Sequence, residues 1–192
     1  MPSLYRFVDS LEAAAAHLEG HFRLASFAHF RDIEDEQRKD SEEGRASYQI
    51  EEGGHVQVAN DTHPTQAIYI LSATACETQA GFGDWRIEIK DPEGLRRKIA
   101  AALPATARVF LEDVRYGKSP ILKAKLDAQG RIDRVWFQKP DKYKAEQEWR
   151  FVAVFAPDLK IENRVLELEL GDCSDVLGLP KWIKEASHVQ NP

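Results

Sequence analysis

The chain has 192 residues and a net charge of -6, because 32 Asp+Glu outnumber 26 Lys+Arg. This balance argues against broad binding to a nucleic-acid backbone, which requires a basic surface. The chain contains no apolar run of about 18 residues that could span a membrane, and no basic segment followed by an apolar run that could act as a signal peptide. We therefore expect a cytoplasmic protein without membrane contacts.

Short runs of alternating or continuous apolar residues, separated by turn residues, set the expected elements. In chain order they predict a strand at 4–8, a helix at 11–18 capped by Asp9, a strand at 22–27, a hairpin of 46–50 and 56–59, a buried central strand at 67–72, a strand at 85–90, a helix at 92–103 capped by Asp91, strands at 109–116, 131–138, 148–155 and 165–170, and a weak helix within 177–192.

Strands outnumber helices in this list, and the two do not alternate regularly. This pattern argues against a doubly wound parallel sheet. We predict an α+β fold with a mostly antiparallel, split β-sheet and two or three helices. The sequence shows no convincing linker, so we expect one domain over 1–192, with the tail from about residue 177 peripheral.

Metal sites are not expected. His17 and His21 are four residues apart on the first predicted helix, a spacing that can bind zinc, but Leu18 stands where the protease motif needs a glutamate. Surface histidines are the better interpretation. The acidic segment 31–44 lacks the ligand order of a calcium loop. Arginines and a lysine among its acids favour a salt-bridged loop.

The strongest signal is the stretch that leads into the strand at 148–155. Glu146, Glu148 and Arg150 stand at alternate positions, so we expect them on one face of that strand. Buried charges need a partner or a function. One interpretation pairs Glu148 with an arginine and packs Trp149 in the core. In the other, Glu148 acts on a bound substrate.

Under this second interpretation, Lys142 and Lys144 would attract phosphates of the substrate, and Tyr143 would stack on one of its rings. The bound molecule would then be a nucleotide.

Four pieces of the chain, spread over about residues 5–155, together resemble a widespread group of uncharacterised bacterial and phage proteins that are single small domains. They are Tyr5-Arg6-Phe7, Phe30-Arg31-x-x-Glu34-Asp35-x-x-Arg38-x-Asp40-x-x-Glu43-Gly44, Tyr69-Ile70-Leu71-Ser72 and Lys139-x3-Tyr143-x2-Glu146-x-Glu148-Trp149-Arg150. The resemblance supplies no activity.

A second resemblance carries an activity. The order Arg6, Ser72-x-Thr74, Glu146-x-Glu148 is similar to the Arg, Ser-x-Ser/Thr, Glu-x-Glu layout of ADP-ribosyltransferases. It implies that NAD is the substrate, that Arg6 holds its phosphates and that Ser72, with Thr74, orders the site. It further implies that Glu148 acts on the ribose and Glu146 on the acceptor, in a transferase or an NAD glycohydrolase of a toxin or phage-conflict setting.

The alternative is a binding module without catalysis. A basic groove floored by Tyr143 and Trp149 would suit short single-stranded nucleic acid or a protein partner. Its cations would be Arg31, Arg38, Lys139, Lys142, Lys144 and Arg150. The enzyme interpretation requires instead that Arg6, Ser72 and Glu148 converge in one pocket of dinucleotide size.

Overall fold

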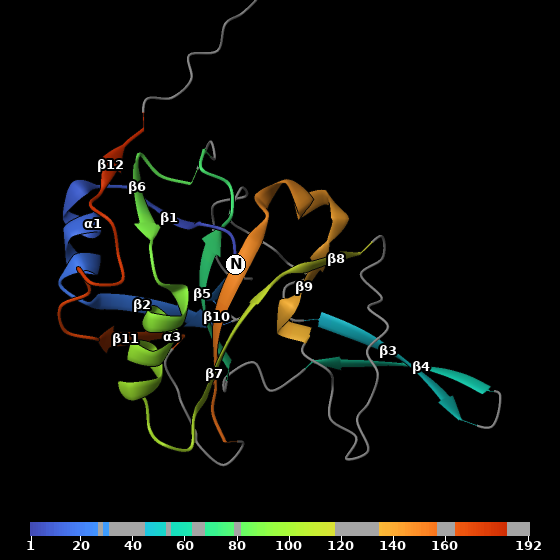
Figure 1. Ribbon diagram of the computed structural model, residues 1–192. Coiled ribbons are helices and arrows are strands. Elements are labelled where there is room, and N and C mark those ends of the chain that lie inside the picture. Colours follow the sequence, from blue (N-terminus) through green and yellow to red (C-terminus); the bar gives the residue numbers. More distant parts are fainter. Residues whose placement is uncertain are drawn as a thin grey trace, which may run out of the picture.

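An eight-stranded antiparallel sheet forms the centre of the molecule (Figure 1). The computed structural model describes residues 1–26, 29–30, 68–78, 82–117, 135–156 and 164–183, together with the backbone of 45–52 and 55–62. The strands of the sheet are β1 (Leu4–Val8), β2 (His21–Ser26), β5 (Ile68–Thr74), β6 (Trp85–Ile89), β7 (Arg108–Asp113), β10 (Glu148–Val154), β11 (Val165–Glu169) and β12 (Lys181–Trp182). The predicted α+β class with a mostly antiparallel sheet is confirmed.

The central strand β5 shows where the sheet divides. Along one edge, β10 pairs with all of β5, from Glu148 opposite Thr74 to Val154 opposite Ile68. The other edge is shared: β2 pairs at Tyr69 and Ile70, and β1 pairs at Thr74. Between these pairings, among the described strands, residues 71–73 face a gap between β1 and β2. The path β11–β2–β5–β1–β6–β12 is thus split at its middle.

Two helices cover one face of this sheet, namely α1 (Leu11–Leu18) and α3 (Pro92–Ala101). Asp91 caps α3 as predicted, since its carboxylate accepts the Gly94 N–H at 2.9 Å. Asp9 was the wrong N-cap for α1. The helix begins one residue later than an Asp9 cap requires, so the Ser10 hydroxyl accepts the Ala13 N–H at 3.1 Å.

The main core lies between the sheet and these two helices. It is formed by buried apolar side chains that include Leu4, Leu24, Tyr69, Leu71, Ile87, Leu95, Ile99, Phe151 and Ala153. Because side chains alternate along a strand, the neighbouring residues of β5 and β10 face the opposite side of the sheet. There Ile68, Ile70 and Val152 bury a smaller cluster with Phe137.

The segment that contributes Phe137 covers part of this second face. It runs through η2 (Val135–Phe137), β9 (Gln138–Pro140) and η3 (Asp141–Glu146), and β9 pairs in parallel with β8 (Arg115–Gly117). Figure 1 shows β8 and β9 beside the sheet, on the side away from α1.

Three further expectations were wrong in their detail. The predicted strand 109–116 is two strands, β7 and β8, separated at buried Val114. The described part of 131–138 is mainly the 3-10 helix η2, because its apolar residues pack around buried Phe137 rather than alternate. No helix forms in the described part of the tail, 177–183. Leu177 is buried and bridges Ile89, and β12 pairs with β6.

The predicted hairpin is confirmed. It consists of β3 (Arg45–Glu52) and β4 (His55–Thr62), which pair antiparallel with Glu52 opposite His55. Among the described residues, no helix is both long and apolar enough to cross a lipid bilayer.

Candidate functional site

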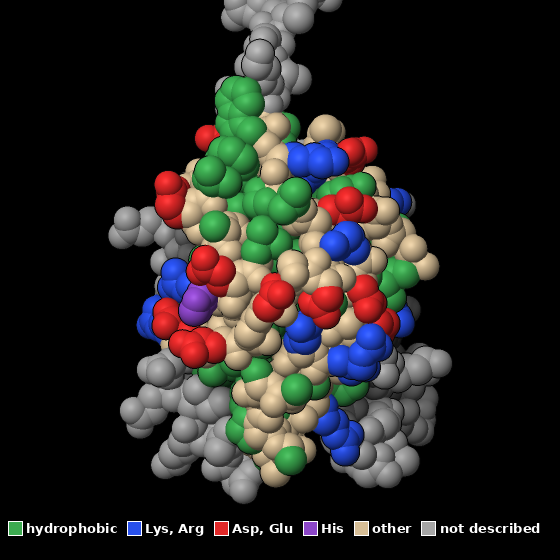
Figure 2. All heavy atoms as spheres, turned by 60° about the vertical axis from the view of Figure 1, so that its left-hand side comes forward, with side chains coloured by type: hydrophobic (Ala, Val, Ile, Leu, Met, Phe, Trp, Pro, Cys, Tyr) green, Lys and Arg blue, Asp and Glu red, His purple; other side chains and the backbone are tan. Residues whose placement is uncertain are grey.

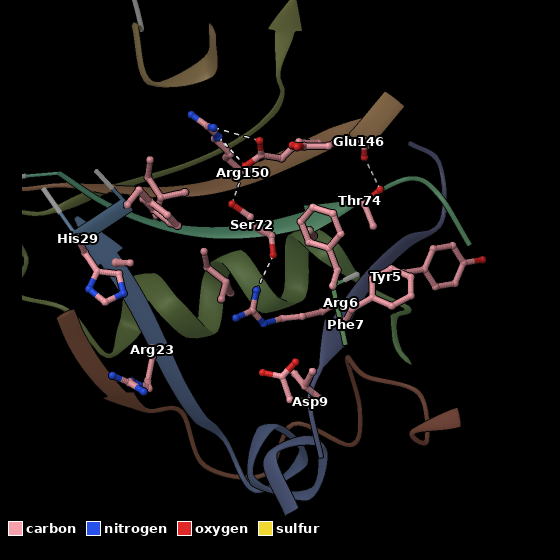
Figure 3. A pocket seen from close by; sticks show the side chains of 18 of the residues that line it. Tyr5, Arg6, Phe7, Asp9, Arg23, His29, Ser72, Thr74, Glu146 and Arg150 are labelled. Atoms are coloured by element: carbon pink, nitrogen blue, oxygen red, sulfur yellow. Dashed lines mark hydrogen bonds and ion pairs between the residues drawn. The ribbon is translucent and has the colours of Figure 1, made fainter. Parts of the chain in front are cut away.

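A cavity of about 530 Å³ opens on the second face of the sheet, next to the split (Figure 3). Three residues from distant parts of the sequence line it: Arg6 on β1, Ser72 on β5 and Glu148 on β10. The register explains the meeting of the last two, since Ser72 lies opposite Arg150 on β10 and Thr74 lies opposite Glu148. The cavity is large enough for a nucleotide-sized ligand.

The Glu148 side chain accepts four hydrogen bonds. Its Oε1 accepts the Ser72 hydroxyl at 2.6 Å and Arg150 Nε at 2.8 Å. Its Oε2 accepts Arg150 Nη2 at 3.0 Å and Lys139 Nζ at 3.2 Å. Burial raises the pKa of this carboxyl, but the adjacent Arg150 and Lys139 outweigh burial and hold the pKa at about 2. Glu148 is therefore ionised at neutral pH.

Glu146 lies beside it, but not on the same strand. It ends η3, and Gln147 follows in the left-handed region with φ 44°, so β10 begins only at Glu148. The expectation of three charges along one strand is thereby corrected. Lys139 Nζ donates to Glu146 Oε2 at 2.7 Å and so joins the two carboxylates. Burial is the main cause that raises the pKa of Glu146.

Thr74 and Tyr143 support this corner of the cavity. The Thr74 hydroxyl donates to the Glu146 carbonyl at 2.5 Å and accepts the Cys76 N–H at 2.9 Å, so Thr74 holds η3 against the end of β5. Tyr143 lines the cavity. The ammonium groups of Lys139 and Lys142 lie 4.5 and 4.6 Å from the centre of its ring, within the range of a cation–π contact.

Arg6 reaches the cavity through the split. Alternation along β1 places it on the same face as Leu4 and Val8, the face that the helices cover. Its guanidinium enters the gap between β1 and β2, where Nη1 donates to the Ser72 carbonyl at 2.7 Å. Figure 3 shows Ser72 between Arg6 and Arg150, with its hydroxyl and its carbonyl bonded to different partners.

Sequence reasoning missed three contributors. The Tyr116 hydroxyl accepts the backbone N–H of Glu148 at 2.8 Å, and burial raises the pKa of Tyr116 to about 12. His17, expected on the surface, is half-buried and accepts Arg6 Nε at 3.1 Å. Arg23 lines the cavity from β2. None belongs to a recognisable motif. For Arg23, the strict alternation of β2 was the one available signal.

The structure also places the residues of the basic groove. Arg31 and Arg38 lie outside the described residues. Lys142 and Lys144 are exposed on η3, whereas Arg150 is buried with 2% of its surface accessible. Trp149 packs against the main core, on the opposite face of β10 from Glu148. Figure 2 shows acidic and basic side chains interspersed over the described part of one face, rather than a continuous basic surface.

The described residues contain no group of three or more His, Cys, Asp or Glu side chains arranged to hold an ion.

Comparison of the chain with protein-family models, with curated proteins and with solved structures finds no match.

Proposed function

We propose that this protein cleaves the nicotinamide–ribose bond of NAD, as an ADP-ribosyltransferase or an NAD glycohydrolase, on an ADP-ribosyltransferase-like split sheet. The observation that supports it is the convergence of Arg6, Ser72 and Glu148, from three separate strands, on one cavity of about 530 Å³. A buried ion pair alone would explain Glu148 and Arg150. It would not explain a guanidinium from β1 at the same cavity.

The ligand would lie across the split. Arg6 would contact the pyrophosphate, since a guanidinium suits two phosphate oxygens at once. Arg23 lines the cavity and is exposed, and it would add positive charge beyond the pyrophosphate. Figure 3 shows Arg23 on the far side of the cavity from Arg150. Tyr143, which lines the cavity from η3 together with Glu146, would place its ring against a flat heterocycle.

The chemistry follows from the ionised state of Glu148. When the bond between ribose C1′ and the nicotinamide nitrogen breaks, its electron pair goes to that nitrogen, which becomes neutral. Positive charge develops on the ribose, and a fixed carboxylate stabilises it. The acceptor, water in the glycohydrolase, then bonds to C1′ and loses one proton. Glu146 would take that proton, because its raised pKa makes it a better base than an ordinary glutamate.

Glu148 already accepts four hydrogen bonds, so a ribose hydroxyl has to replace one of them. The Lys139 contact at 3.2 Å is the longest of the four. Lys139 would keep its shorter bond to Glu146 at 2.7 Å when the ribose enters. Ser72 and Arg150 would remain in place and hold the carboxylate in a fixed orientation.

The test is nicotinamide release from NAD by the purified protein. Glu148→Gln should lower the rate by on the order of a hundredfold, because it removes the charge that stabilises the transition state. Glu169→Gln, on an exposed position of β11, is the matched control and should match the parent protein. Background-level release by the parent protein would remove the proposal.

Glu148→Gln also leaves Arg150 buried without its anion, which costs roughly 3–5 kcal/mol of stability. Ser72→Ala keeps the ion pair and removes only the hydroxyl that orients the carboxylate. It should lower the rate by about tenfold in a folded protein. Unchanged release by Ser72→Ala, with Glu148→Gln unfolded, would contradict the assigned role of Glu148.

A further inference from the structure

His17 lies behind the split, on the helix that spans it. Helix α1 contacts β2 on one side of the gap and β1 and β6 on the other. The His17 ring packs edge-on against Phe22, with ring centres 4.7 Å apart. The side chain thus faces the sheet from the covered side, and the cavity reaches through the split to Ala13 of the same helix.

The hydrogen bonds of His17 fix which of its nitrogens carries a proton. Arginine Nε always bears a hydrogen, so in the 3.1 Å contact Arg6 donates and His17 Nε2 accepts. The other nitrogen, Nδ1, lies 2.7 Å from the Ala13 carbonyl, which can only accept. His17 is therefore the neutral tautomer with hydrogen on Nδ1. Burial, followed by the charge of Arg6, lowers the pKa of His17 to about 4, so the neutral form persists at neutral pH.

Two of the contacts that Arg6 makes act on different edges of its guanidinium. Nη1 donates to the Ser72 carbonyl at 2.7 Å, and Nε donates to His17 at 3.1 Å. A planar group held at two edges has a fixed plane as well as a fixed position. An arginine on a flexible stem otherwise loses rotamer entropy whenever it takes up a ligand.

We propose that His17 is a positioning residue: it holds the Arg6 guanidinium in the split and thereby sets the affinity of the cavity for the anionic part of its ligand. The effect on affinity rests on the proposed NAD-cleaving function. The contact between His17 and Arg6 can be measured without it.

The kinetic test compares three variants. His17→Met fills the space without offering a nitrogen acceptor, and it should raise KM for NAD by about tenfold with kcat little changed, since Arg6 binds ground state and transition state alike. His17→Gln keeps an acceptor and should restore most of the affinity. His21→Met, four residues on and exposed, is the matched control. A His17→Met variant with the parent KM would overturn the proposal.

Nuclear magnetic resonance of the ligand-free protein supplies a test that does not depend on turnover. The His17 ring should show the tautomer with hydrogen on Nδ1. The Arg6 Nε–H should exchange with water at least about tenfold more slowly in the parent protein and in His17→Gln than in His17→Met. Equal exchange in all three would overturn the positioning role. Slow exchange with no cleavage of NAD would support the positioning and count against the proposed function instead.

Discussion

At the scale of single residues, a buried cluster of four charges dominates the site. Glu146, Glu148, Lys139 and Arg150 are linked by four hydrogen bonds, two of which run from Arg150 to Glu148 as a fork. Arg150 also donates to the Trp136 carbonyl at 2.8 Å, which ties the segment over the second face to β10. Pairing a buried carboxylate in this way avoids the cost of an isolated buried charge.

This cluster predicts how stability depends on pH. The pKa of Glu148 is lowered from 4.5 to about 2 in the folded protein. The contribution of this shift to stability is therefore complete above about pH 4.5 and is lost as pH falls toward about 2, by roughly 3–4 kcal/mol in total. Glu146 acts in the opposite sense, because its pKa is raised, and it offsets part of the loss.

Urea unfolding at several values between about pH 6 and about pH 3 measures this effect. The free energy of unfolding should fall more steeply for the parent protein than for Glu148→Gln, whose side chain does not titrate. Parallel curves for the two proteins would contradict a strongly lowered pKa at Glu148.

At the scale of elements, the junction between η3 and β10 sets the positions of the two glutamates. Gln147 is the only described non-glycine residue with positive φ. Its N–H donates to the Lys144 carbonyl at 3.3 Å, and its own carbonyl accepts the Ala75 N–H at 3.0 Å. This bend lets Glu146 approach Lys139 from η3 while Glu148 starts the strand.

The bend can be tested at an exposed position where packing plays little part. Gln147→Val should lower the free energy of unfolding by about 1–2 kcal/mol, because a β-branched side chain is strained at positive φ. Gln147→Gly should be close to neutral, since glycine adopts this backbone freely but orders at a higher entropic cost. Chemical denaturation of the parent protein and of both variants measures the order of their stabilities. Equal stabilities would show that the backbone at 147 is not left-handed.

Several elements of the fold, but not all contacts of the site, could be predicted from the sequence. Periodicity was sufficient for β1, β5, β10 and both helices, because each has an apolar face that spans its length. The same periodicity predicted that Glu148 and Arg150 lie on one face of β10. It could not give the turn at Gln147, since glutamine carries no strong signal for a left-handed backbone. Nor could it give the contact of Arg6 with His17, which depends on where α1 crosses the split.

At the scale of the whole molecule, the sheet separates two tasks. One face buries the main core under α1 and α3, and the other carries the charged cluster, while the cavity reaches from that second face into the split as far as Ala13 of α1. Residues of the same strand serve both, since Phe151 faces the core and Arg150 faces the site. Val8, Leu71 and Ala73 belong to the main core and also line the cavity, but the core residues of α3 do not. The core can therefore be weakened at α3 without changing a residue that lines the cavity.

Ile99→Ala tests this separation. Ile99 is fully buried on α3 and does not line the cavity. Its truncation should cost about 2–4 kcal/mol of stability, yet leave nicotinamide release near the parent rate at temperatures where the variant is folded. Thermal unfolding and the nicotinamide-release assay, both on one preparation, compare the stability and the rate of the variant with those of the parent protein. A large loss of rate in the folded variant would show that the two faces are coupled.

Arg6 in the split has a consequence for how such a protein can evolve. Its Nη1 supplies a hydrogen bond to a strand carbonyl at a point where the neighbouring strands part. A lineage that discards this arginine gives up a piece of its architecture together with the proposed ligand contact. Selection for folding alone would thus preserve the residue after the chemistry had gone, and descendants that no longer act on any substrate could keep the guanidinium as an inherited scaffold part.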